Sequence, residues 1–473
     1  MGKYKRLGRN MIFQAIGKFS SKLLVFLLIP LYTSVMSTEE YGVADYVGVT
    51  VTLLYPIITL IIVEAEFRFA LDPNEDKNNI FSFSIVVGVI GLLVVLLLSP
   101  VLRRLSVINS VFWYFYLQLS MYVMYEIFVH FAIGLDRFST TATAGVINTA
   151  ANVFSTVIAL VVLHTGVRGY LIANSIGYLF GSIFIYFREK LYLYFTTKFL
   201  KAKDLIRRML KYSIPMVPNS ICWWINNSAD KYMMEFFCGV SSMALLSVAY
   251  KIPTILFTVV SMFVSAWHVS AADRFGTEEN RAFFQTIYKL FNLIVTISAL
   301  ICLIFTQELS RFLFKSDFYV AWKIVPVLIL GTVFQSGATF FTSVFTANKN
   351  NNTLFISTVV GSVINIALNI LLIPIYEGIG AAIATLAGYL AIYIIRFLFS
   401  RKVLTLGFRV NDEVFSFVVL FIAAYYSYKA LGTRLIVGIV GLGLLLIIQR
   451  KMVKLVFSNI QRLYKSKKAD NKP

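Results

Sequence analysis

Polar and charged residues interrupt an apolar stretch between Lys211 and Met234, and they are the first candidates for chemistry. The stretch reads KYSIPMVPNSICWWINNSADKYMM. Its polar members include an ammonium group, a carboxylate and several amides: Asn219, Asn226, Asn227, Asp230 and Lys231. A charge near the centre of a bilayer costs at least ~2.5–3.5 kcal/mol, so such residues usually face protein or a wet cavity. This mixture indicates ligand binding inside a membrane.

Helical spacing places these residues in two neighbouring rows. One row follows steps of four, three and four: Asn219, Trp223, Asn226 and Asp230. The adjacent row contains Ser220, Trp224, Asn227 and Lys231. Residues three and four apart share a helix face, so the two rows predict one broad polar and aromatic stripe.

Further cations occur in or near other apolar runs, namely Lys22, Arg68 and Lys251. A ring of cations around a cavity between two halves of the protein would suit an anionic substrate. The alternative is a set of internal salt bridges, in which Asp230 or Glu66 neutralises these cations. The residues alone leave both interpretations open.

Acidic residues inside the apolar runs are candidates for a coupling-ion or proton site. They are Asp45, Glu64, Glu66 and Asp230. Glu64 and Arg68 stand four apart and can simply pair on one helix. The sequence therefore leaves open whether transport is coupled to Na+, to H+ or to the membrane potential.

No catalytic constellation is present in the sequence. It lacks a P-loop and the HExxH and GxSxG motifs, and its three cysteines form no CxxC pair. We therefore expect a secondary transporter without cofactor or metal, and not an enzyme.

Composition indicates a polytopic membrane protein. The 473 residues are 58% hydrophobic and 14% charged, against ~45–50% apolar and ~25% charged in soluble chains. The net charge of +20 resides in loops and tails, as in membrane proteins that follow the positive-inside rule. This distribution argues against nucleic acid as a partner.

About fourteen apolar runs are long enough to cross a bilayer, which predicts an all-α fold. The loops favoured as cytoplasmic carry roughly four times as many Lys and Arg residues as the opposite loops, which predicts two cytoplasmic termini. The expected spans are 10–36, 41–67, 80–101, 111–134, 141–163, 168–187, 212–237, 241–268, 282–307, 320–346, 353–374, 378–399, 413–431 and 434–457.

An internal repeat divides the first twelve spans into two sets of six. VINTAAN from Val146 matches VINIALN from Val363, and GYLIANSIGYL from Gly169 matches GAAIATLAGYL from Gly380. Repeats with an even number of spans are related by an axis along the membrane normal, and substrate sites lie between them. The predicted domains are a six-helix lobe, a basic cytoplasmic linker, a second six-helix lobe, two additional helices and a basic tail: 1–187, 188–211, 212–399, 400–457 and 458–473.

These segments resemble the polysaccharide-transport family, the Wzx-type repeat-unit flippases of the multidrug, oligosaccharidyl-lipid and polysaccharide exporter superfamily. The resemblance is carried by GKFSSKLLVFLLIPLYTSVMSTEEYG near the N-terminus, by Asp230-Lys231-Tyr232, by SVAYKI around Lys251, and by NIALNILLIPIYEGIGAAIAT. It implies two six-helix lobes in a V. It further implies alternating access, which moves an undecaprenyl-pyrophosphate-linked oligosaccharide to the outer leaflet of the bacterial cytoplasmic (inner) membrane.

The resemblance also assigns roles to the candidate residues. Lys22, Arg68, Lys231 and Lys251 would be the cations of a central cavity, and Asp230 would position Lys231. Sugar would stack on or hydrogen-bond to Trp223, Trp224, Asn226 and Asn227. The expected partners are the lipid-linked substrate, membrane lipids, and polysaccharide polymerase and chain-length proteins.

Three alternatives stay open on the sequence. The fourteen spans exceed the twelve of the minimal family, so an O-antigen (lipopolysaccharide), capsule or other glycan exporter and a lipid II-type flippase all fit. A multidrug cation antiporter of the same superfamily would need carboxylates where this chain offers cations. A scaffold in a polysaccharide-assembly complex would leave lysines in the membrane without a purpose.

Overall fold

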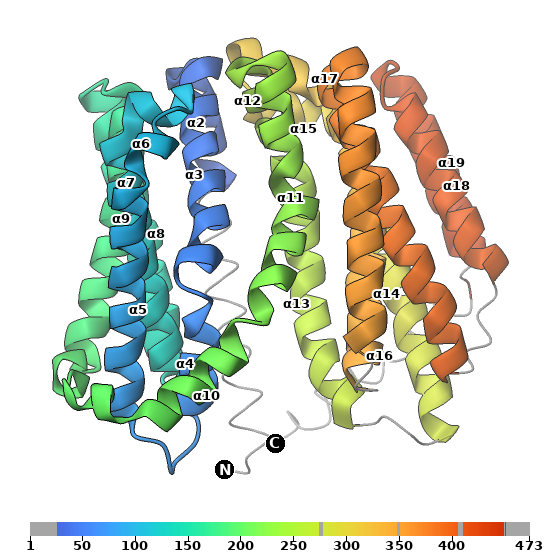
Figure 1. The fold of residues 1–473 in the computed structure, drawn as a ribbon. Helices are drawn as coiled ribbons and strands as arrows, with labels where there is room; N and C mark the ends of the chain where they lie inside the picture. The colour runs from blue at the N-terminus through green and yellow to red at the C-terminus, as the bar shows by residue number, and fades with distance from the viewer. Residues whose placement is uncertain (1–25, 274–277, 348–350, 405–409, 449, 451–473) are drawn as a thin grey trace, which may run out of the picture. The chain divides into compact units, whose positions relative to one another are not determined.

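The structure is a computed structural model, and its described part consists of helices joined by turns and short irregular segments, with no strand in that part (Figure 1). Ten helices among the described residues are long and apolar enough to cross a membrane. These observations confirm the predicted all-α, multi-pass membrane fold. The described residues are 26–273, 278–347, 351–404, 410–448 and 450.

Contacts divide the chain into two compact units, which we describe separately. Unit 1 extends to Ser247 and includes Leu313–Phe318, and unit 2 contains Val248–Phe312 and the chain from Tyr319 onward. The domain boundaries given by the sequence repeat remain a prediction.

Unit 1 contains the helices from α2 to α11 and most of α12 (Val240–Ala249). A π-helical segment, Ile158–Val162, extends α8. The main helices are α2 (Ile29–Val35), α3 (Thr38–Ile58), α4 (Ile62–Ala70), α5 (Lys77–Leu97), α6 (Ser99–Leu102), α7 (Ser106–Gly134), α8 (Phe138–Val157), α9 (Gly166–Arg188), α10 (Lys203–Ser213) and α11 (Met216–Cys238).

Unit 2 contains the helices from α13 onward, apart from Leu313 at the end of α15, and includes the two that follow the sequence repeat, α18 and α19. A single assignment, α17, covers two predicted spans, and its backbone breaks at Glu377, where φ is 46°. This break coincides with the turn expected between 374 and 378. The helices are α13 (Lys251–Asp273), α14 (Glu278–Ile304), α15 (Thr306–Leu313), α16 (Val325–Ala347), α17 (Asn351–Leu404), α18 (Val410–Tyr426) and α19 (Leu431–Ile448).

The second predicted span, 41–67, is not one continuous helix. Helix α3 ends at Ile58, Leu60 and Ile61 have φ values of 51° and 50°, and α4 begins at Ile62. Proline lacks the N–H that an interior helical turn needs, and Pro56 lies in the last turn of α3, two residues before its end. The hydroxyl of Thr59 donates to Tyr55 O (2.6 Å) beside this interruption. Apolar composition predicts the span but does not show where its backbone breaks.

The repeated hairpins pack in the same way in both units. In unit 1 a Cβ added to Gly177 would lie 2.9 Å from Asn148 O. In unit 2 a Cβ added to Gly388 would lie 3.0 Å from Gly361 O and 3.1 Å from the Cβ of Asn365. Gly177 corresponds to Gly388 in the sequence repeat, and Asn148 corresponds to Asn365. Small residues therefore permit close helix packing, as they commonly do in membranes.

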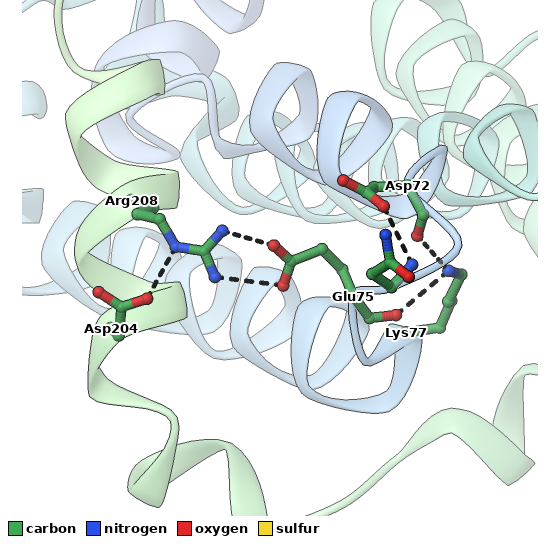
Figure 2. Close-up of polar contacts among 6 residues, drawn as sticks. Asp72, Glu75, Lys77, Asp204 and Arg208 are labelled. Atoms are coloured by element: carbon green, nitrogen blue, oxygen red, sulfur yellow. Dashed lines mark hydrogen bonds and ion pairs between the residues drawn. The ribbon is translucent and has the colours of Figure 1, made fainter.

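Helix α10, in the predicted basic linker, is amphipathic and lies on unit 1. Its buried Leu205 and Met209 join a hydrophobic cluster with Ile62, Ala65, Ile80, Phe83 and Phe199. Figure 2 shows the Arg208 guanidinium facing the carboxylate of Glu75, with Asp204 on its other side. The same guanidinium lies 5.5 Å from the centre of the Phe69 ring. An apolar face and an ion pair together fix α10 next to the break that precedes α4.

Candidate functional site

Helix α3 supplies one side of the candidate site. It begins with a capping box, in which Glu40 N donates to Ser37 Oγ (3.1 Å) and Ser37 N donates to Glu40 Oε2 (3.0 Å). These bonds satisfy amide groups that have no partner within the helix. A Cβ at Gly42 would lie 2.5 Å from Val240 O, so glycine permits the start of α12 to approach. Asp45 lies about one turn further along α3.

Lys231, from the predicted stripe on α11, forms an ion pair with Asp45. The distance between Lys231 Nζ and Asp45 Oδ2 is 2.7 Å, and their side chains are 13% and 16% exposed. The hydroxyl of Ser247, on α12, donates to the same carboxylate oxygen (2.7 Å). Three helices of unit 1 thus meet at one carboxylate. Asp45 neutralises Lys231, whereas the salt-bridge alternative had named Asp230 or Glu66.

Aromatic residues extend this contact along α3 and α11. Trp224 Nε1 donates to Val49 O (3.2 Å), and the hydroxyls of Tyr232 and Thr50 are 2.5 Å apart. The Tyr232 ring also lies 4.6 Å from the Tyr46 ring and 5.4 Å from the Trp224 ring, centre to centre. Trp224 contacts Val49, whereas Lys231, seven residues later on α11, contacts Asp45, four residues earlier on α3, so the two helices are antiparallel.

Three further polar residues of the stripe form hydrogen bonds to backbone groups of their own helix. Asp230 is 2% exposed, and Asp230 Oδ1 accepts from the backbone N–H of Lys231 (2.9 Å). Asn226 Nδ2 donates to Cys222 O (3.0 Å), and Asn227 Nδ2 donates to Trp223 O (2.7 Å). Asn226 is buried, whereas Asn227 is exposed and Trp223 is half-buried.

Of the four predicted cations, Lys231 is the one whose described contacts have been given above, and the grouping of all four in one cavity stays a prediction. Arg68 is exposed on α4, beyond the end of α3 that lies away from Asp45. Lys251 is half-buried at the start of α13, in unit 2. Lys22 lies outside the described residues. Lys231 is therefore the predicted cation for which the described contacts define a site.

Among the candidate coupling residues, Glu66 has the most unusual position. It is 0% exposed, and neither carboxyl oxygen has a hydrogen-bond partner among the described residues. The nearby Ser84 hydroxyl donates to Ile80 O (3.1 Å). Glu64, two residues earlier on α4, is half-buried. Asp45 and Asp230 take part in the contacts described above.

Sequence reasoning did not name Arg396, which is 1% exposed in the second half of α17. Its guanidinium donates to five oxygens, all of them uncharged. They are Ser357 Oγ (2.9 Å), Ala338 O (3.0 Å), Thr342 Oγ1 (2.8 Å), Leu354 O (3.5 Å) and Thr358 Oγ1 (2.9 Å). A charge inside the predicted span 378–399 was the available signal. Ser247, Tyr46 and Thr50, which also contribute to the site at Lys231, carried no such signal.

The contacts around Lys231 can exchange. An ammonium group that is only partly exposed can release its carboxylate when an anionic ligand offers better hydrogen bonds. Proton uptake by Asp45 would have the same effect. Within the described part of the chain, no three His, Cys, Asp or Glu residues come close enough to hold a metal ion.

Sequence comparisons relate this chain to families of membrane proteins. The pattern of the family described as "Polysaccharide biosynthesis protein" matches residues 7–269, and that of the MatE family matches residues 215–371. An uncharacterized membrane protein of Methanocaldococcus jannaschii is 25% identical over 223 residues, which is 44% of this chain. The chain spans 42% of the length of that relative.

Comparisons of structure support the same fold. The lipid II flippase MurJ, in an inward closed conformation, superposes with a TM-score of 0.73, 17% identity and coverage of 93% of this chain and 100% of that one. An inward-facing MATE multidrug transporter gives 0.65, 15% identity and coverage of 83% and 98%. A transporter of the same superfamily from Pyrococcus furiosus gives 0.59, 14% identity and coverage of 84% and 95%. At such identities the likeness establishes the fold alone.

Proposed function

The chain belongs to the polysaccharide biosynthesis protein family, and from this premise we propose that it is a flippase for an undecaprenyl-pyrophosphate-linked oligosaccharide. The substrate would move from the inner to the outer leaflet of the bacterial cytoplasmic membrane by alternating access. The observation that carries the proposal is the ion pair of Lys231 with Asp45, set beside Trp224 and Tyr232. An ammonium group and aromatic rings are the groups that a pyrophosphate-linked sugar needs.

In this proposal the Asp45 carboxylate forms an ion pair with the Lys231 ammonium group when no substrate is bound. A pyrophosphate carries more negative charge than one carboxylate, so it competes for the ammonium group. Asp45 then keeps its hydrogen bond from Ser247, and Asp230 holds the backbone of Lys231 in place. The sugars would contact Trp223, Trp224, Asn226 and Asn227. Lys22, Arg68 and Lys251 would add cations along the path.

We further propose Glu66 as the first residue to test for coupling on unit 1. A carboxylate that is buried without a cation is costly, and a bound proton removes that cost. Asp45, Glu64 and Asp230 stay as alternatives, together with coupling to Na+ or to the membrane potential. Cytoplasmic termini, and polymerase and chain-length proteins as partners, belong to the same proposal.

The test is translocation of a fluorescent polyprenyl-pyrophosphate oligosaccharide by purified protein in liposomes, with and without an imposed membrane potential. We expect Lys231→Ala to lower the flipping rate by at least tenfold, because the pyrophosphate loses its cation. Lys231→Arg should retain much of the rate, and Asp45→Asn should weaken the competition for Lys231 and lower the substrate concentration at half-maximal rate. Arg311→Ala, a cation on the short helix α15, is the matched control.

Full flipping by a folded Lys231→Ala variant would overturn the proposal. If wild-type protein flips lipid II but not other oligosaccharide lipids, the lipid II-type alternative is correct. If it flips neither and expels a cationic dye, the chain is an antiporter, like the multidrug transporters that share its fold.

A further inference from the structure

Three ionisable side chains of unit 2 form a continuous hydrogen-bonded chain outside the site described above. The hydroxyl of Tyr393 donates to Glu413 Oε2 (2.9 Å), and the hydroxyls of Tyr393 and Tyr288 lie 2.8 Å apart. The three side chains are buried, with exposures of 9% for Glu413, 5% for Tyr393 and 2% for Tyr288. They come from α18, α17 and α14, so the chain connects three helices.

A small cavity of about 10 Å³ adjoins this chain. Tyr288 and Tyr393 line it together with Asn292 and Thr296, and Thr296 Oγ1 donates to Asn292 Oδ1 (3.0 Å). A cavity of this size holds one water if polar partners are present, and two hydroxyls, an amide and a threonine provide them. The rest of the wall is apolar, with Phe417 from α18 among its members.

Several described charged groups lie on the helices that pack around this chain. On α14 Lys289 follows Tyr288 and is half-buried, and α16 contains no titratable residue. On α17 Arg396 donates to five uncharged oxygens, and the Arg401 guanidinium lies 5.9 Å from the Phe397 ring centre. On α19 Arg434 binds Glu308. The acceptor of the Tyr393 hydroxyl is the Glu413 carboxyl group.

We propose that Glu413, Tyr393, Tyr288 and one water in the adjoining cavity form a proton-binding site that couples transport to pH. This inference rests on the proposed function, and it adds a site that the sequence did not indicate. The proton comes from bulk solvent and binds to the Glu413 carboxylate, and no other bond forms or breaks.

A change in hydrogen-bond direction makes the site sensitive to its proton. A tyrosine hydroxyl both donates and accepts. When Glu413 is ionised, Tyr393 donates to it and Tyr288 donates to Tyr393. When Glu413 is protonated, Tyr393 can donate to Tyr288, and Tyr288 to the water. Protonation therefore replaces a charge-assisted bond between α17 and α18 by a neutral one, which is roughly half as strong.

The position of Glu413 gives α18 a role in transport. Helix α18 follows the two six-span repeats, whereas α14 and α17 belong to the second repeat. Glu413 stands in the first turn of α18, directly after the basic segment 400–412, whose lysine and arginine residues predict a cytoplasmic position. The site would therefore exchange protons with the cytoplasm. The resulting change in hydrogen bonding would reach α14 and α17.

The first experiment is an infrared titration of the full-length protein in lipid, followed at the C=O band of protonated carboxyl groups. We expect a band that titrates with pH, is lost in Glu413→Gln and persists in Glu377→Gln, which removes an exposed carboxyl of the same unit. Tyr393→Phe should shift its midpoint by about one pH unit, since it removes the donor to Glu413. If Glu413→Gln fails to fold, Tyr393→Phe decides the assignment alone.

The second experiment measures flipping against cytoplasmic pH in the same variants. We expect the wild-type rate to depend on pH and the Glu413→Gln rate to be flat over the range of the infrared midpoint. A band unchanged by both Glu413→Gln and Tyr393→Phe overturns the proton site. Identical pH profiles of wild type and Glu413→Gln overturn the coupling. If wild type does not flip, the proposed function and the coupling fall together, while the infrared result still decides the proton site.

Discussion

The α8–α9 hairpin of unit 1 and the α17 hairpin of unit 2 are copies in sequence, but their polar contacts differ. In both, a glycine packs against an asparagine on the facing helix. In unit 2 the buried Arg396 occupies the position that corresponds to Ile185, which is 0% exposed in unit 1. Near the same end of the unit 1 hairpin, Arg137 instead lies 3.3 Å from Glu189, and Thr140 also donates to Glu189.

This comparison separates what a repeat must keep from what it can change. The glycine contact sets the distance between the helices, so both copies keep it. The polar contacts at the end of the hairpin can be an exposed ion pair or a buried guanidinium among uncharged oxygens. The first kind is sensitive to salt, whereas the second is not, because salt screens exposed charges far more than buried ones.

The largest effect is expected from Arg396→Ala. It removes a large buried side chain and leaves a cavity lined by three hydroxyls, which should lower the free energy of unfolding by roughly 2–5 kcal/mol. Thermal unfolding in detergent measures this, with Arg396→Lys as a variant that keeps the charge but has fewer donors. Wild-type stability of Arg396→Ala would show that the guanidinium does not hold unit 2 together.

The next largest loss of stability is expected from glycine substitutions in both repeated hairpins. Gly177→Ala and Gly388→Ala each place a methyl group against backbone or side-chain atoms of the facing helix. Such overpacking typically costs about 1–3 kcal/mol. Gly48→Ala on α3 is the control, because a Cβ there meets nothing within 4 Å. A large loss in one copy and none in the other would break the equivalence of the hairpins.

Unit 2 also offers an ion pair for comparison with those of unit 1. Arg434 donates to both carboxylate oxygens of Glu308 (2.7 and 2.8 Å) and so holds the pKa of Glu308 below its usual value. A lowered folded-state pKa means that this stabilisation is complete above the unfolded pKa of about 4.3 and is lost as the pH falls through the folded value.

The measurement is the unfolding temperature as a function of pH below neutrality. We expect wild type to lose stability on acidification and Glu308→Gln to lose less of it. The difference should be modest, because the Glu308 side chain is 40% exposed and solvent screens the pair. Parallel curves for the two proteins would argue against the ion pair as a source of acid sensitivity.

The smallest effect is expected at Arg137 and Glu189. The Arg137 side chain is 61% exposed, and exposed ion pairs contribute about 0–1 kcal/mol. Arg137→Ala should therefore change the unfolding temperature slightly at low salt and not at all at high salt. A salt-independent loss would indicate that Arg137 stabilises unit 1 by packing.

The sequence was sufficient to predict the fold class and most of the spans. Apolar runs and helical spacing are local properties, and the sequence repeat identified corresponding hairpins before any contact was known. The break between α3 and α4 could not be located, since Pro56 is tolerated inside α3 while the chain turns at Leu60 and Ile61. Backbone interruptions depend on packing that periodicity does not encode.

The candidate site was predicted in part. The stripe containing Trp224 and Lys231 follows from spacing along one helix. Spacing does not reveal the partner of Lys231, because Asp45 stands 186 residues away in the chain. Several acidic residues were equally eligible on the sequence, and only the packing of α3 against α11 distinguishes Asp45 from Glu66. Long-range pairing of this kind requires the three-dimensional structure.

The surroundings of Arg396 have a consequence for biosynthesis. All five oxygens that accept from its guanidinium belong to residues between Ala338 and Thr358, which the ribosome completes before Arg396. An arginine in an inserting helix costs up to about 2.5–3.5 kcal/mol at the translocon, the value for the helix centre. Because its acceptors precede it in the chain, they can enter the membrane before the second half of α17 does. The order of synthesis thus lets this hairpin insert a charge that an isolated helix would carry unpaired.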